Sequence, residues 1–130
     1  MVQVLETLAV NTRDANGNEA ATKYRTVVVK DHIDPTITVL QDNPYTIEAS
    51  TTPYQDLGVT VVDLSDPTVV VNSDISNVNV SRVGIYTVVY TATDASGNEA
   101  VTKYRTVVVQ DTNEPVITVD PPNPYTIEAS

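Results

Sequence analysis

Short alternations of apolar and polar residues recur along this chain about every ten residues, and no stretch keeps a helical period. Pro, Asp, Asn and Gly bound these alternations, as is typical of strands separated by turns. The pattern predicts seven strands, at residues 36–40, 45–49, 58–63, 68–72, 77–81, 85–93 and 102–109. Short strands at this spacing favour an all-β fold of the sandwich type.

The last two predicted strands are the most informative. One face of the strand at 85–93 is expected to line the core, and it carries Tyr86, Val88, Tyr90 and Ala92. In the strand at 102–109 the apolar residues fall on both sides, so its inner face stays open. The two strands flank "DASGNE", in which Gly97 and Asn98 can adopt a positive φ, so we expect an antiparallel hairpin.

Much of the chain occurs twice. Residues 11–50 and 91–130 are identical at 27 of 40 positions, including "TKYRTVVV" and "NPYTIEAS". The period of 80 residues exceeds the roughly 20 to 50 residues of solenoid units, which favours separate domains in tandem. Residues 1–10 depart from the repeat, so that part is a diverged copy or no copy. We predict the C-terminal strands of a preceding unit at 1–31, a complete unit at 34–111 and the N-terminal strands of a following unit at 115–130.

Two longer motifs carry a family resemblance. "GIYTVV" resembles the tyrosine corner of immunoglobulin-type domains, with Tyr86 at the corner and Val88 in place of the usual cysteine. "YQDLGVTVVDLSD", followed by "VGIYTVVYTATDASGNEAVTKYRTVVVQD", resembles the bacterial immunoglobulin-like repeats of surface proteins. Such repeats also occur as accessory domains of insecticidal crystal toxins and are similar to hyalin-type repeats. The resemblance covers residues 34–111 and implies an immunoglobulin-like antiparallel β-sandwich in tandem repeats of about 80 residues.

Composition narrows the classes of partner. Seventeen acidic and seven basic residues give a net charge of −10, which repels nucleic acid and anionic lipid surfaces. No apolar run approaches the roughly 18 residues of a membrane span, so we expect no membrane insertion within this segment. The absence of cysteine excludes disulfides and thiolate metal sites.

Acidic residues recur in pairs at the predicted loops, and the candidates are Asp31 with Asp34, Asp63 with Asp66, and Asp111 with Glu114. Calcium takes six to eight oxygen ligands from carboxylates and carbonyls. A junction between two sandwiches could supply such ligands from both domains, so Ca²⁺ at the junctions is the one cofactor that we consider. The alternative is that these residues are solvated linker carboxylates and turn formers.

Two cations fall on one face of the last strand in each copy, Lys23 with Arg25 and Lys103 with Arg105. Two interpretations are open. The cations could pair with acidic residues of a neighbouring unit, or they could protect an edge strand from pairing with another chain.

The resemblance implies a non-enzymatic extracellular module that acts as a structural spacer or adhesion stalk on a cell, filament or particle surface. Its partners would be neighbouring repeats of the same kind. The only histidine, His32, lies in the predicted linker and has no cysteine to activate, so we expect no enzyme.

Two alternatives to the spacer stay open. The loops could bind carbohydrate or a surface protein, as accessory toxin domains would. Residues 115–130 of one molecule could instead complete the strand-deficient 1–31 of another and form a head-to-tail fibre. Against the fibre, residues 51–80 have no counterpart at either end, so the composite sandwich would lack its middle strands.

Overall fold

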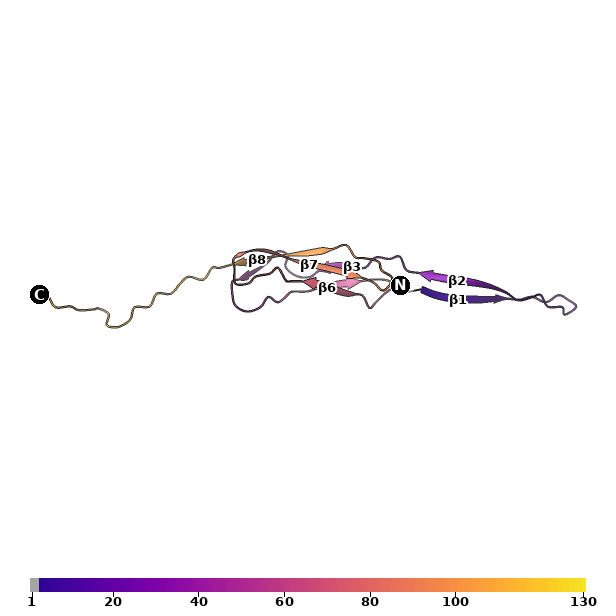
Figure 1. Cartoon of the computed structure of the whole chain (residues 1–130), viewed down its shortest axis with the longest axis horizontal. Coiled ribbons are helices and arrows are strands. Elements are labelled where there is room, and N and C mark those ends of the chain that lie inside the picture. Colours follow the sequence, from indigo (N-terminus) through magenta and orange to yellow (C-terminus); the bar gives the residue numbers. More distant parts are fainter. Residues whose placement is uncertain (1–2) are drawn as a thin grey trace.

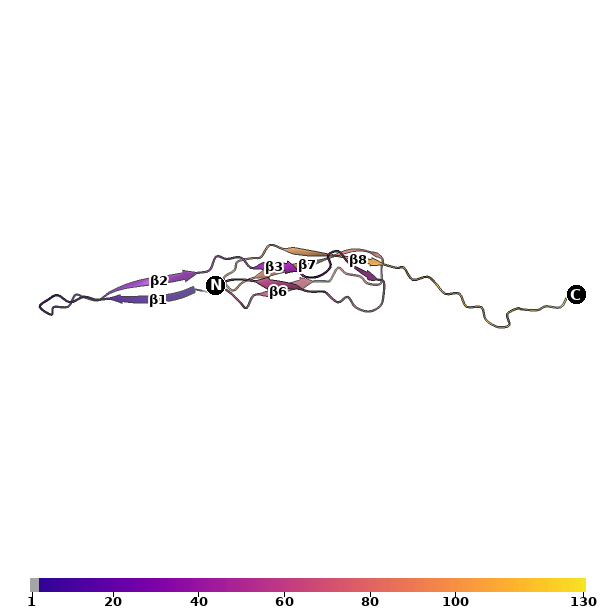
Figure 2. The ribbon, with the colours of Figure 1, turned by 180° about the vertical axis from the view of Figure 1, so that it is seen from behind.

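A computed structural model describes residues 3–130 of the chain, and residues 1 and 2 of the segment predicted at 1–31 lie outside it. The described residues form strands and no helix (Figures 1 and 2). The strands are β1 (Gln3–Val10), β2 (Lys23–Lys30), β3 (Thr36–Val39), β4 (Tyr45–Glu48), β5 (Val59–Val62), β6 (Val70–Asp74), β7 (Gly84–Thr93) and β8 (Lys103–Gln110).

Strands β3 to β8 make a two-layer sandwich. One layer is a sheet of four strands in the order β4-β8-β7-β6, and β3 with β5 forms the other. Between them lies a core of aliphatic and tyrosine side chains: Ile37, Tyr54, Val88, Tyr90, Ala92, Ala100, Val107 and Val109. The prediction of an all-β sandwich is therefore confirmed.

The face predicted for β7 is also confirmed. Val88 and Tyr90 are fully buried and Tyr86 is half-buried, whereas the alternate Thr87 and Thr91 are exposed. The hydroxyl of Tyr86 donates to the backbone carbonyl of Arg82 at 2.8 Å, which is the bond of a tyrosine corner.

Gly84 leaves room for the tyrosine corner. A Cβ at this position would lie 3.2 Å from the hydroxyl oxygen of Tyr86 and 3.3 Å from the adjacent ring carbon. The absence of a side chain at Gly84 thus lets the Tyr86 ring lie against the start of its own strand.

Removing the corner hydroxyl is expected to have a modest cost. The variant Tyr86→Phe should lose about 1 kcal/mol of unfolding free energy, because a partly exposed hydrogen bond to a carbonyl contributes about that much. Tyr104→Phe is the matched control, since Tyr104 is 56% exposed. Urea unfolding followed by circular dichroism measures both. Equal stabilities of the two variants would contradict a role for the corner bond.

One predicted strand is wrong. Residues 77–81 form turns, with the amide of Arg82 donating to the carbonyl of Asn79 at 3.3 Å. The Asn79 side chain accepts hydrogen bonds from the backbone and hydroxyl of Ser81. Such local bonds compete with a sheet ladder, so the Val78 and Val80 alternation packs against the core from a loop.

The two interpretations of the cations do not hold for Arg105. Strand β8 is central in its sheet, and the Arg105 side chain is fully buried. Its Nε donates to the Tyr90 hydroxyl at 3.0 Å and lies 3.4 Å from a carboxylate oxygen of Asp56. Its remaining guanidinium nitrogens donate to the backbone carbonyls of Leu40, Asp42 and Gly58. Arg105 therefore closes the core instead of protecting an edge.

The carboxylate of Asp56 completes this buried group. It accepts hydrogen bonds from the hydroxyls of Tyr54 at 2.9 Å and Tyr90 at 2.7 Å, and from the amide of Gly58 at 3.0 Å. Every partner of the buried cation is thus itself held by a hydrogen bond or by the backbone, as a buried charge requires.

Strands β1 and β2 form a separate antiparallel hairpin. Val4 pairs with Val29, and eighty residues later Gly84 pairs with Val109, so the two hairpins have the same register. Residues 1–10, which depart from the repeat in sequence, therefore keep its geometry from residue 3 onward. The division of the chain into one complete and two partial units stays a prediction.

The molecule is elongated (Figures 1 and 2). The β1–β2 hairpin extends from one end of the sandwich, and residues 111–130 leave the other end without forming a strand. The five residues between Lys30 and Thr36 connect the hairpin to the sandwich, and Pro35 among them is buried. This short connection brings the start of the linker against the sandwich.

Candidate metal centre

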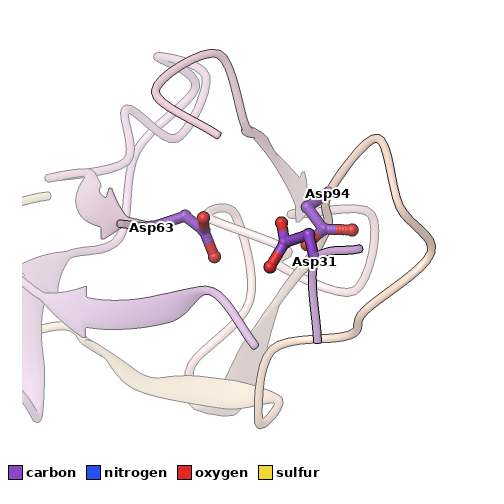
Figure 3. Close-up of side chains that lie close together, drawn as sticks. All are labelled: Asp31, Asp63 and Asp94. Carbon is purple, nitrogen blue, oxygen red and sulfur yellow. The ribbon is translucent and has the colours of Figure 1, made fainter. Parts of the chain in front are cut away.

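Three aspartates meet where the hairpin joins the sandwich. Asp31 is the first residue after β2, Asp63 the first after β5 and Asp94 the first after β7. One carboxylate oxygen of each lies within 4.8 Å of those of the other two. Figure 3 shows Asp63 and Asp94 on either side of Asp31. The linker and two loops of the sandwich thus supply one carboxylate each.

Local turn chemistry orients each carboxylate. The Oδ1 atoms of Asp31 and Asp63 accept backbone amides two residues further on, at 2.9 Å from Ile33 and 2.7 Å from Ser65. Asp94 does the same with Ser96 at 2.8 Å. Aspartate favours such turns, in which one oxygen bonds its own backbone and the other is left to point away.

The second oxygens of two of these aspartates are buried without a partner. Oδ2 of Asp31 and Oδ2 of Asp63 have no hydrogen bond in the described structure. Oδ2 of Asp94 accepts the side-chain amide of Asn98 at 2.7 Å. A buried carboxylate oxygen without a donor is costly, and a cation held between these side chains would satisfy both atoms.

The negative charges of the three aspartates also favour a bound cation. Ionised carboxylates whose oxygens lie within 4.8 Å of one another repel each other. Burial raises the pKa of Asp94, but hydrogen bonds from Asn98 and from nearby backbone amides lower it by a larger amount. The net pKa of Asp94 therefore lies below its ordinary value. Asp94 is therefore charged at neutral pH, and a divalent cation would offset the repulsion.

The donor set fits calcium. All three side chains offer hard carboxylate oxygens, and the described residues place no histidine in the group. Calcium prefers six to eight such oxygens in a flexible geometry, and carbonyls and water commonly complete its shell. Asp31, Asp63 and Asp94 would hold the ion.

The other predicted ligands lie elsewhere. Asp66 is buried, but its Oδ1 accepts from Thr68 and its Oδ2 accepts the amide of Ala95 at 3.0 Å. It ties its own loop to the β7–β8 turn. Asp34, Asp111 and Glu114 are exposed.

Asp111 nevertheless repeats the local geometry of Asp31. Its Oδ1 accepts the amide of Asn113 at 3.2 Å, two residues further on, just as Asp31 bonds Ile33. The following linker is also held by Glu48, which accepts the amide and hydroxyl of Thr112. The sequence interpretation did not include this contact of Glu48.

Asp94 was also absent from the predicted set. A signal for it existed, because Asp94 and Asp14 open the repeated turns "DASGNE" and "DANGNE", which differ at one position. In both loops the Asp side chain accepts the amide and carboxamide of the Asn four residues on. A search limited to close acidic pairs could not find a ligand that stands alone in its loop.

Comparisons with known proteins agree with this architecture. The chain matches the family described as bacterial surface protein, Ig-like domain, over residues 37–109. A search of curated proteins finds no match to the chain. Among residues 3–130, no helix is long and apolar enough to cross a membrane.

The matched residues run from β3 into β8, so they span the sandwich and two of the three clustered aspartates, Asp63 and Asp94. The expected resemblance to bacterial immunoglobulin-like surface repeats and the immunoglobulin-like fold are both confirmed. This chain belongs to the Ig-like domain family of bacterial surface proteins.

Proposed function

We propose that this chain is a non-enzymatic structural module of a surface protein, and that calcium stiffens the junction between one Ig-like unit and the next. The observation that carries the proposal is the meeting of Asp31 with Asp63 and Asp94. The family supports an association with the bacterial surface. Spacing or presenting something outside the cell is the role that we infer.

The junction is built to respond to a cation. Asp31 belongs to the linker, whereas Asp63 and Asp94 belong to the sandwich. Without an ion, repulsion among the three carboxylates opposes the approach of the linker to the sandwich. With an ion, the same three groups become ligands of one centre, and the hairpin is held in one orientation.

The repeat extends this arrangement to a series of units. Asp111 stands eighty residues after Asp31, and Asp14 eighty residues before Asp94. Each would be the corresponding ligand of the next and of the preceding junction. A series of units would then bind one calcium ion at every junction. The bound ions would restrict bending between units, so that the series behaves as a stiff rod.

Calorimetry of the full chain tests the calcium site. We expect one Ca²⁺ per chain, with a dissociation constant of roughly 10⁻⁴ to 10⁻³ M, the range of extracellular calcium-binding modules. Asp63→Asn should weaken binding at least about tenfold, since it removes a charged ligand. Asp74→Asn is the matched control, because Asp74, exposed at the end of β6, forms the same kind of turn with Ser76. Equal affinities of the two variants would contradict the site.

Junction stiffness needs its own measurement. The chain has no cysteine, so spin labels can be placed at Thr7→Cys on the hairpin and Thr87→Cys on the sandwich, both exposed positions. Calcium should narrow the distance distribution between them, and Asp63→Asn should abolish the narrowing. An unchanged width on calcium binding would leave the metal site in place but overturn its mechanical role. Binding of carbohydrate or of a surface protein by the loops stays a prediction from the family resemblance.

A further inference from the structure

Strand β2 has an open edge. It pairs with β1 on one side, and no other described residue pairs with it. The corresponding strand β8 is flanked on both sides, by β7 and by the parallel strand β4. In the described part of the chain, strand β2 lacks both a β4 counterpart and a facing sheet, and its apolar residues are correspondingly open: Val29 is 55% exposed, whereas Val109, eighty residues later, is 1% exposed.

The strand that would fill this edge is present in the chain. Residues 43–50, which include β4, read "NPYTIEAS", and residues 123–130 have the identical sequence. In the second copy these residues are unpaired, with Tyr125 76% and Ile127 74% exposed. An apolar strand without a partner and an apolar edge without a partner therefore coexist.

The contacts between β4 and β8 can be reproduced on β2. Tyr45 pairs with Val107 and Ile47 with Val109 in parallel register. The residues at the equivalent β2 positions are again valines, Val27 and Val29. Because the ladder bonds come from the backbone, the identical segment at 123–130 can form the same bonds along β2 once it becomes extended.

The side chain of Asn43 anchors the start of this pairing. It donates to the carbonyl of Tyr104 at 3.0 Å and accepts the amide of Thr106 at 2.9 Å. Asn123 is its counterpart, and Tyr24 and Thr26 are the counterparts of the β8 residues. The anchor is thus available to residues 123–130 as well.

Charge favours the new pairing over the existing one. Glu48 lies opposite Gln110 in the β4–β8 ladder. At the equivalent position of β2 the residue is Lys30, so Glu128 would lie opposite a cation. An opposite-charge pair across a ladder is stabilising. Glu128 would form such a pair with Lys30, whereas Glu48 cannot form one with the neutral Gln110.

We propose that the open edge of β2 binds residues 123–130 of a second copy of this chain as a parallel strand. The hairpin and the tail extend from opposite ends of the sandwich (Figure 1), so the tail of one copy meets the hairpin of the next in a head-to-tail order. β5 and β6 have no counterpart in either segment, so the product is a three-stranded sheet and not a full sandwich. Three strands are the least that a stable sheet requires, so the association is weak.

Disulfide trapping between two singly substituted chains tests the register. Thr46 pairs with Val108, so Val28→Cys in one sample and Thr126→Cys in another should form a mixed dimer on oxidation. Thr7→Cys, at an exposed position of β1, replaces Val28→Cys in the control. We expect the mixed dimer to form about tenfold faster with Val28→Cys than with the control, because pairing raises the local concentration. Equal rates would overturn the proposal. The reaction is run with a chelator, so its outcome is separate from that of the calcium site.

A charge swap tests the same contact without cysteines. Sedimentation of the full chain up to millimolar concentration should show self-association, and Glu128→Lys should weaken it about tenfold by placing like charges opposite each other. The double variant Lys30→Glu with Glu128→Lys should restore it. A chain that stays monomeric, or a double variant no better than Glu128→Lys alone, would contradict the proposal.

Discussion

Replacing Arg105 by methionine is expected to lower the unfolding free energy of the sandwich by about 3 to 5 kcal/mol. The methionine fills much of the same space but leaves the carboxylate of Asp56 without its cation. It also removes the guanidinium donor 2.8 Å from the Leu40 carbonyl, and it removes one of the two donors to the Gly58 carbonyl, which keeps the amide of Leu40. Loss of one partner of a buried ion pair costs more than the pair contributes, because the remaining charge stays desolvated.

The chain provides a control for this variant. Arg25 occupies the equivalent position in the repeated "TKYRTVVV" segment, but it is exposed on the hairpin. Arg25→Met makes the same chemical change and should alter the stability of the sandwich by less than about 0.5 kcal/mol. Urea unfolding at neutral pH compares them. If Arg105→Met cost no more than Arg25→Met, the buried network would not be a main source of stability.

Asp56→Asn is expected to cost about 2 to 3 kcal/mol at pH 7, at the low end for a broken buried pair because 15% of the Asp56 side chain is exposed. The variant keeps the size of the side chain and removes its charge. The hydroxyls of Tyr54 and Tyr90 then donate to a weaker acceptor, and Arg105 becomes an uncompensated buried cation.

The cost of Asp56→Asn should depend on pH. Burial raises the pKa of Asp56, but hydrogen bonds from Tyr90, Tyr54 and Gly58 and the charge of Arg105 lower it by a larger amount. The net pKa lies below the ordinary value of 3.8. A depressed folded-state pKa gives stability that is complete above the unfolded pKa and is lost as pH falls through the folded pKa. The wild type should therefore lose its advantage over the variant in strong acid.

Urea unfolding at pH 7 and near pH 2 measures this difference. Asp120→Asn in the exposed tail controls for the loss of one negative charge. The difference in unfolding free energy between Asp56→Asn and the wild type should disappear at low pH. If it persisted, the Asp56 side chain would act through packing and not through its charge.

The predictability of the fold depended on how each strand is buried. β7 alternates strictly, so its inner face could be read directly from Tyr86 to Ala92. In β8 the inner face carries Arg105 together with Val107 and Val109, and a charge among apolar residues obscured the alternation. Nothing local to β8 indicates the burial of Arg105, because the backbone carbonyls that accept its hydrogen bonds lie in loops 47 to 65 residues away in the sequence.

The candidate metal centre was half predictable for a similar reason. The sequence indicated Asp31 and Asp63 as junction carboxylates, but it paired each with its nearest acidic neighbour. The structure instead combines one aspartate from each of three separate segments. That grouping follows from β5 and β7 ending at the same end of the sandwich, which requires the strand pairing and not the local spacing.

The β1–β2 and β7–β8 hairpins have the same register, and their shared turn sequence explains why. In "DANGNE" and "DASGNE" the Asp amide donates to the Asn carbonyl and the glycine amide to the Asp carbonyl, with Gly17 and Gly97 at φ 85° and 88°. The strands preceding these turns share little sequence, yet they align identically with their partners. The six residues of the turn therefore set the register of each hairpin. The strand that precedes the turn can diverge in sequence without a change of register.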